Sequence, residues 1–292
     1  MPILTALLLA AAPPPATPKI RSPGDAVKAA RAADWAEIPA DELMVMDLAN
    51  GKRVVIQLAP IFAPVHVANL KIMARAGYWG RATVYRVVDN WVTQWGLGDG
   101  PFKSPPGVID RPPEEYQRSA RGLTLTPMGS PDPYSSMAAY TEGWPVAKQP
   151  GGIVNAAYCY GTVGVARDAA PDTGNGSELF TVIGATARRL DRNYALVGRV
   201  IEGMEYLSAL PRGTADMGVY AKDQSPLAIT SVRIAADMPA GQRPRFEYLK
   251  SGSPAFADYV QLASHRRDYG VPSPGADLCA VPVPVRKVGV KS

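Results

Sequence analysis

The sequence TVYRVVDNWVTQWG, residues 83–96, contains two short runs that are rich in β-branched and aromatic residues. These residue types favour strands, and the Asp89-Asn90 pair between the two runs favours a turn. The stretch therefore predicts two antiparallel strands joined by a tight connection.

Two polar side chains interrupt the apolar surface that this hairpin would form. If the side chains alternate strictly, Arg86 shares a face with Val84 and Val88, where a solvated surface would carry more polar residues. Gln94 belongs to the second run, so we expect Arg86 and Gln94 to form a polar spot on an apolar floor. An arginine in a purely structural hydrogen-bond network would give the same pattern, and this stretch alone leaves both interpretations open.

Four blocks of sequence, taken in order, resemble the cyclophilins, the peptidyl-prolyl cis-trans isomerases. Any one of the blocks is a weak signal, whereas four in the right order are a strong one. They are YR and WVTQ at residues 85–86 and 91–94, GTVGVAR at 161–167, GSELFTVI at 176–183, and LD with VGRVIEGM at 190–191 and 197–204.

The resemblance implies a mainly β fold, a closed antiparallel cyclophilin-like β-barrel capped by helices. It also implies isomerisation of X-Pro bonds in unfolded or folding polypeptides. This chemistry proceeds without a covalent intermediate, and it requires neither a metal nor a cofactor.

The resemblance further assigns roles to nine residues. Arg86 would donate a hydrogen bond to the nitrogen of the twisted X-Pro amide, and Gln94 would position the guanidinium and bind the substrate backbone. The substrate-binding positions are Trp91, Val92, Phe180 and Leu190 for the proline ring, Ala166 and Arg167 for the peptide backbone, and Tyr194 in place of a common family histidine.

Some positions depart from the family pattern. Val92 stands where methionine is usual, which implies a shallower proline pocket. Arg167 and Glu178 stand where neutral side chains are often found, and we expect them to form an ion pair at the rim of the groove. These departures support an alternative function, a catalytically weak module that binds proline-containing segments or a partner protein.

Composition limits the other possibilities. The chain has 292 residues, of which 47% are hydrophobic and 20% are charged, as in folded globular proteins. Its net charge is only +5, and no basic run is interleaved with aromatic residues. The sequence therefore gives no indication of nucleic-acid binding.

We predict four segments. Residues 1–17 form a leader, 18–40 an N-terminal helical segment, 41–236 the cyclophilin-like domain, and 237–292 an extension packed on that domain. The apolar run at residues 3–12 has the length of a signal-peptide core and is too short to span a membrane. It predicts a periplasmic or secreted protein, although no Lys or Arg precedes it, and an Ala/Pro-rich disordered leader is the alternative.

Local patterns predict most of the elements. Residues 97–158 contain ten prolines and little periodicity, so we expect an irregular insertion with at most a helical turn at 113–118. His66 is expected on the surface of a helix that begins at Pro64. The other expected elements are helices at 26–35, 204–210 and after Ser253, a hairpin of 43–48 and 53–58 around Asn50-Gly51, strands at 161–166, 179–183, 195–201 and 228–235, and an extended segment at 281–285.

The two cysteines, Cys159 and Cys279, lack the spacing of metal ligands, and His66 and His265 add no companion ligands. In an exported chain, an even pair of cysteines indicates a disulfide. We therefore predict that Cys159 and Cys279 are bonded to each other.

Overall fold

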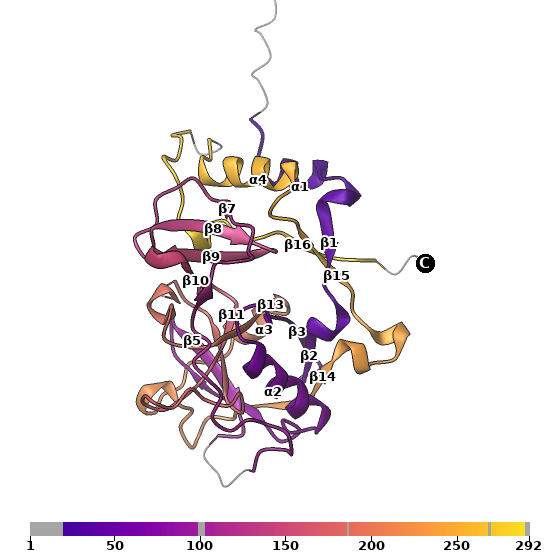
Figure 1. The fold of residues 1–292 in the computed structure, drawn as a ribbon. Coiled ribbons are helices and arrows are strands. Elements are labelled where there is room, and N and C mark those ends of the chain that lie inside the picture. Colours follow the sequence, from indigo (N-terminus) through magenta and orange to yellow (C-terminus); the bar gives the residue numbers. More distant parts are fainter. Residues whose placement is uncertain (1–19, 99–102, 186, 268–269, 290–292) are drawn as a thin grey trace, which may run out of the picture.

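The computed structural model describes residues 20–98, 103–185, 187–267 and 270–289. Eight antiparallel strands close into a barrel in the order β11-β12-β5-β4-β14-β2-β3-β13, which forms the lower part of Figure 1. The predicted closed β-barrel is therefore confirmed. Its strands are β2 (Leu43–Leu48), β3 (Arg53–Leu58), β4 (Thr83–Val87), β5 (Val92–Gly96), β11 (Thr162–Val165), β12 (Leu179–Val182), β13 (Leu196–Glu202) and β14 (Leu227–Ile234).

The barrel interior is filled by alternate side chains of its strands. Met44 and Met46 of β2 and Val54 and Ile56 of β3 are completely buried there. The hairpin between these strands turns at Gly51, whose φ of 77° is one that glycine adopts without strain. Helix α2 (Pro64–Arg75) packs its apolar side against the same core, and the short helix α3 (Glu205–Ser208) follows β13.

The N-terminus of α2 is capped by a residue from a distant part of the chain. Ala63 precedes the helix and offers no capping side chain. Glu115 instead accepts hydrogen bonds from the backbone N–H groups of Val65 and His66, each at 3.0 Å, and its carboxylate lies 2.7 Å from Nδ1 of His66. The prediction that His66 is exposed is therefore wrong, because its ring is buried between Glu115 and the Thr173 carbonyl.

Residues 97–158 are not irregular as predicted, and the helical turn expected at 113–118 does not form. They contain a five-stranded antiparallel sheet of order β6-β10-β9-β8-β7. Its strands are β6 (Arg118–Ser119), β7 (Thr126–Pro127), β8 (Met137–Thr141), β9 (Trp144–Gln149) and β10 (Ile153–Ala156). Among the prolines described in this region, only Pro127 and Pro145 lie within strands. The others lie in the connections between strands, so they do not interrupt the sheet. Glu142 and Gly143 both have positive φ, which forms the tight β8–β9 turn.

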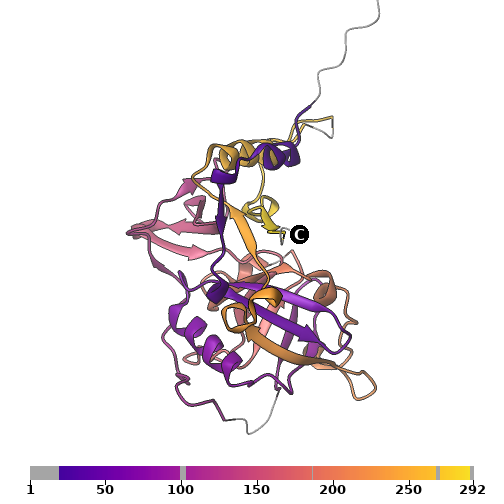
Figure 2. The same cartoon turned by 90° about the vertical axis from the view of Figure 1, so that its right-hand side faces the viewer.

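The N-terminal segment, this insertion and the C-terminal segment share a second hydrophobic core. Helices α1 (Pro23–Ala29) and α4 (Pro254–Ser264) cover it, as Figure 2 shows. Strands β1 (Trp35–Glu37), β15 (Phe246–Leu249) and β16 (Val285–Lys287) form a three-stranded sheet beside it. The helix predicted at 26–35 is therefore too long, because Trp35 pairs with Leu249 in the sheet.

A disulfide joins Cys159, just before β11, to Cys279, as predicted. The segment that follows Cys279 is further held by hydrogen bonds from Tyr140 to the Val281 carbonyl and from Tyr259 to the Pro282 carbonyl. Within the described residues, no helix is long and apolar enough to cross a membrane.

Removing the disulfide should destabilise the protein. It closes a loop with a sequence separation of 120 residues. In the chain-entropy model, such a loop contributes about 4–5 kcal/mol. The double variant Cys159→Ala/Cys279→Ala should therefore unfold at a lower urea concentration than the parent. Dithiothreitol should lower the parent's midpoint toward that of the double variant and leave the variant unchanged, whereas equal midpoints for oxidised parent and variant would contradict the prediction.

The Glu115 cap should make stability depend on pH. Although burial opposes it, hydrogen bonds from His66 and the helix N-terminus hold the pKa of Glu115 below its ordinary 4.5. A carboxyl with a lowered folded-state pKa stabilises the protein above its unfolded-state pKa, and this contribution is lost as pH falls through the folded-state pKa.

Glu115→Gln should therefore lower the free energy of unfolding at pH 7 by about 1–3 kcal/mol. The difference from the parent should shrink below about pH 4.5. Urea unfolding between pH 7 and pH 3 measures it, with the exposed neighbour variant Glu114→Gln as the control. A difference that stays constant across this range would contradict the proposed role of the carboxylate.

Candidate active site

Strand pairing places the central predicted residues in one row. Arg86 on β4 lies directly opposite Gln94 on β5, Gln94 lies opposite Phe180 on β12, and Phe180 lies opposite Gly164 on β11. Residues that are directly opposite in an antiparallel pair project from the same face of a sheet. The four positions therefore form a continuous row across four strands, on the outer face of the barrel.

A β-bulge between Val84 and Arg86 changes the predicted alternation. Val84 and Val87 are both buried in the barrel core, so they point inward. Arg86 consequently does not share a face with Val84, because the bulge adds one residue to β4 and reverses the pattern. Val88 does lie on the outer side, where it packs against the apolar cluster that contains Val92 and Phe180.

Arg86 and Gln94 are directly hydrogen-bonded. Nη1 of Arg86 donates to Oε1 of Gln94 at 2.9 Å, and Nε donates to the Met217 carbonyl at 2.7 Å. Burial lowers the pKa of Arg86 below its ordinary value, but a guanidinium remains charged at neutral pH. The two residues predicted to act together are thus in contact, while the Met217 anchor was not predicted.

Tyr85 and Glu178 fix the orientation of Gln94. Tyr85 donates its hydroxyl hydrogen to Oε2 of the Glu178 carboxyl group at 2.8 Å. The hydroxyl oxygen then accepts from Nε2 of Gln94 at 2.6 Å, which turns Oε1 of Gln94 toward Arg86. No sequence pattern predicts this chain of bonds, because it depends on the bulge that brings Tyr85 next to Gln94.

The residues predicted to hold a proline ring gather beside this row. Val92, Phe180 and Leu190 are buried in one apolar cluster, with exposed fractions of 3%, 5% and 6%. Gly164 makes room for the Phe180 ring, since a Cβ at this position would lie 2.4 Å from Cζ of Phe180. The other predicted residues of the pocket, Trp91, Ala166 and Tyr194, are partly buried against the same cluster.

Arg167 lies at the edge of the cluster, but it does not form the predicted ion pair with Glu178. Its side chain donates to the carbonyls of Asn193 and Asp168, at 3.1 and 2.7 Å, and its guanidinium lies 4.8 Å from the centre of the Tyr194 ring. Glu178 instead accepts from Tyr85 and from the Gly98 N–H. The prediction fails because the two side chains turn toward different neighbours.

The insertion contributes aromatic residues that sequence reasoning missed. Tyr158, which follows β10, stacks on Phe180 with ring centres 6.0 Å apart, and burial raises the pKa of Tyr158 well above its ordinary 10.0. Trp144 of β9 packs edge-on against Phe62 in the same cluster. These residues belong to the same apolar cluster as Phe180, and only the tertiary structure shows it. Among the described residues, no group of His, Cys, Asp and Glu side chains could hold a metal ion.

Comparison with known proteins agrees with this arrangement. Residues 43–234 match the family model described as "Cyclophilin type peptidyl-prolyl cis-trans isomerase/CLD". Proteins of Brucella suis and Brucella abortus, each named "Probable peptidyl-prolyl cis-trans isomerase", are 26% identical over 213 residues, which cover 73% of this chain and 89% of theirs.

The fold has a solved counterpart in cyclophilin AquaCyp293 of Hirschia baltica. The two structures align with a TM-score of 0.68 and 24% identity, covering 87% of this chain and 93% of that one. The matching family model, with which the closed barrel agrees, shows that this chain belongs to the cyclophilin-type peptidyl-prolyl cis-trans isomerase family.

Proposed function

We propose that this protein isomerises X-Pro bonds and that Arg86 stabilises the twisted amide. Members of its family act on proline-containing peptides. The observation that carries the proposal is the hydrogen-bonded Arg86–Gln94 pair, held in register with Phe180 at the edge of an apolar cluster. The guanidinium would act on the amide nitrogen of an X-Pro bond, and the partly buried side chains of the cluster, such as Trp91 and Tyr194, would contact the proline ring.

The reaction requires a donor that acts mainly in the transition state. An X-Pro bond rotates in tens of seconds or more without catalysis, because amide conjugation resists twisting. Twisting frees the nitrogen lone pair, so a donor aimed at that nitrogen stabilises the transition state more than the ground state. Among the described residues, Nη2 of Arg86 has no hydrogen-bond acceptor, while Nε and Nη1 are held by Met217 and Gln94.

The peptide backbone would bind beside β11. The Ala166 N–H already donates to the Glu178 carbonyl at 2.9 Å, so it is not available to a substrate. The Ala166 carbonyl and the Arg167 N–H have no hydrogen-bond partner in the described part of the chain. These two groups could pair with an extended peptide as a short added strand.

A binding module with little catalysis is the second candidate. The near-complete burial of Val92, Phe180 and Leu190 favours it, because it leaves little apolar surface to hold a proline ring during isomerisation, whereas a peptide backbone could still bind beside β11. In such a module, Arg86 and Gln94 would contact the peptide without accelerating its isomerisation.

Arg86→Ala should nearly abolish isomerisation. Removing one preorganised hydrogen-bond donor typically lowers the rate by a factor of about 10²–10³. Arg86→Lys should not restore activity, because a point charge does not reproduce the planar fork that Met217 and Gln94 hold. A protease-coupled assay on short X-Pro peptides measures the rates, and circular dichroism shows whether each variant is folded.

Variants of the supporting residues serve as controls for this result. Gln94→Ala and Tyr85→Phe should lower the isomerisation rate less than Arg86→Ala does, because these side chains orient the guanidinium rather than contact the amide nitrogen. A folded Arg86→Ala protein with the parent rate would refute the role of Arg86. If the parent binds proline peptides without accelerating their isomerisation, the protein is a binding module instead.

We also propose that the protein works in the periplasm or outside the cell, on exported polypeptides. The Cys159–Cys279 disulfide supports this, since disulfides persist mainly in oxidising compartments. The leader predicted at residues 1–17 lies outside the described residues. Cell fractionation after rapid thiol alkylation should find the chain outside the cytoplasm with both cysteines oxidised, and a cytoplasmic chain with free thiols would contradict the proposal.

A further inference from the structure

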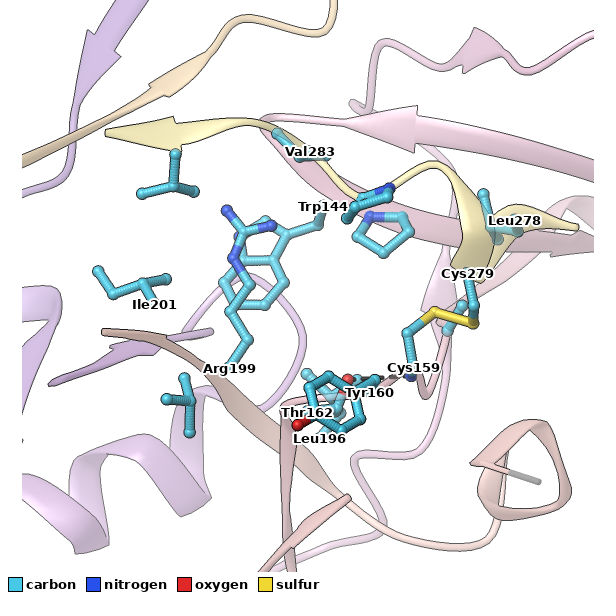
Figure 3. A pocket seen from close by; sticks show the side chains of 15 residues that line it. Trp144, Cys159, Tyr160, Thr162, Leu196, Arg199, Ile201, Leu278, Cys279 and Val283 are labelled. Carbon is cyan, nitrogen blue, oxygen red and sulfur yellow. Dashed lines mark hydrogen bonds between the residues drawn. A yellow bond between two sulfur atoms is a disulfide. The ribbon is translucent and has the colours of Figure 1, made fainter. Parts of the chain in front are cut away.

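A cavity of about 310 Å³ lies between the barrel and the C-terminal segment (Figure 3). Its walls are mainly apolar, with Leu196 and Ile201 on β13 and Leu278 and Val283 on the C-terminal segment. The Cys159–Cys279 disulfide closes one side, as the yellow bond in Figure 3 shows. The volume is at the small end of ligand pockets, which span about 300–1,000 Å³.

One charged side chain enters this apolar space. Arg199 on β13 lies directly opposite Thr162 on β11 and Gln57 on β3, so the three side chains project from the same face of the barrel. Gln57 accepts from Nε and Nη2 of Arg199 at 3.0 and 2.7 Å, and the Gly143 carbonyl accepts from Nη1 at 2.8 Å. The guanidinium also lies 4.5 Å from the centre of the Trp144 ring, so its orientation is fixed.

The positive charge of Arg199 is not neutralised by these contacts. Its hydrogen-bond partners are an amide and a backbone carbonyl, and no carboxylate of the described residues pairs with it. Burial lowers the pKa of Arg199 to about 10, which leaves it charged at neutral pH. Its three bonds use three of the five guanidinium N–H groups, so two have no acceptor in the described part of the chain. A fixed cation in an apolar cavity favours an anionic ligand, because burying a charge without a counter-charge is unfavourable.

We propose that this cavity binds a small monocarboxylate with an apolar body. The carboxylate would accept hydrogen bonds from the two remaining N–H groups of Arg199, a geometry that suits the planar guanidinium. Thr162 adds a donor, since its Oγ1 accepts from the Cys159 N–H at 3.0 Å and its own hydrogen has no acceptor among the described residues. The apolar body would pack against Leu196 and Val283.

This site is distinct from the Arg86–Gln94 row. The Arg86–Gln94 row runs across β4, β5 and β12 to Gly164 on β11, whereas Arg199 and Gln57 lie on β13 and β3 and Thr162 precedes Gly164 by two residues. The ligand chemistry has two possible sources, a free small acid or the C-terminal carboxylate of a polypeptide. Because the two sites are formed by different side chains, the proposal does not depend on isomerase activity.

Isothermal titration calorimetry of the full chain tests the proposal with matched probes. The parent should bind 3-phenylpropanoate, and it should bind the neutral 3-phenylpropanamide about 10- to 100-fold more weakly, as expected for a hydrogen-bonded charge pair. A peptide that ends in a free C-terminal phenylalanine, compared with its amidated form, tests the polypeptide source. Binding of only the small acid indicates a free acid, and binding of the free-acid peptide indicates a chain terminus.

Two variants localise the binding to this cavity. Arg199→Gln should remove the preference for the acid, and Val283→Phe should fill the apolar part and weaken binding while leaving the charge in place. Arg53→Gln, an exposed arginine of β3, is the matched control and should bind like the parent. Equal binding of acid and neutral amide, no binding of either acid or peptide, or parent-like acid binding by folded Arg199→Gln would each overturn the proposal.

Discussion

The antiparallel register of the barrel strands is the constraint on which the rest of the structure depends. The interior is filled by side chains such as Met44, Ile56 and Trp95, so polar groups that act on a ligand must project outward. Register then decides which outward residues are neighbours. It aligns Arg86 with Gln94 and Phe180 on one side of the barrel, and Arg199 with Thr162 and Gln57 on another.

The segments outside the barrel give these two outer surfaces different environments. The insertion supplies Tyr158 and Trp144, which pack in the same apolar cluster as Val92 and Phe180. The C-terminal segment is tied by the disulfide and packs with the N-terminal helix in a second core, so it covers the Arg199 surface and makes it a cavity. Additions that look peripheral in the sequence thus shape both candidate sites.

Local patterns predicted much of the barrel but not its irregularities. The Asn50-Gly51 turn predicted the β2–β3 hairpin, and the presence of two cysteines predicted the disulfide. The contact between Arg86 and Gln94 was predicted from the blocks of sequence that resemble the cyclophilins. The β4 bulge could not be predicted, because one additional residue leaves no mark in an alternating pattern. The predictions of an exposed His66 and of an Arg167–Glu178 ion pair were wrong for a related reason. Each of these side chains binds a partner from a distant part of the chain.

In the proposed mechanism, Arg86 has its chemical value because no carboxylate among the described residues pairs with it. An ion pair would occupy the guanidinium and reduce its attraction for the nitrogen of a twisted amide. Glu178 is close in the network, yet Tyr85 and the Gly98 N–H hold its two oxygens, and no ion pair joins it to Arg86 in the described part of the chain. Tyr85 and Gln94 therefore connect the two charges through neutral groups. In the proposed mechanism, neutral oxygens orient the guanidinium, and its charge remains available to the amide of a neutral substrate.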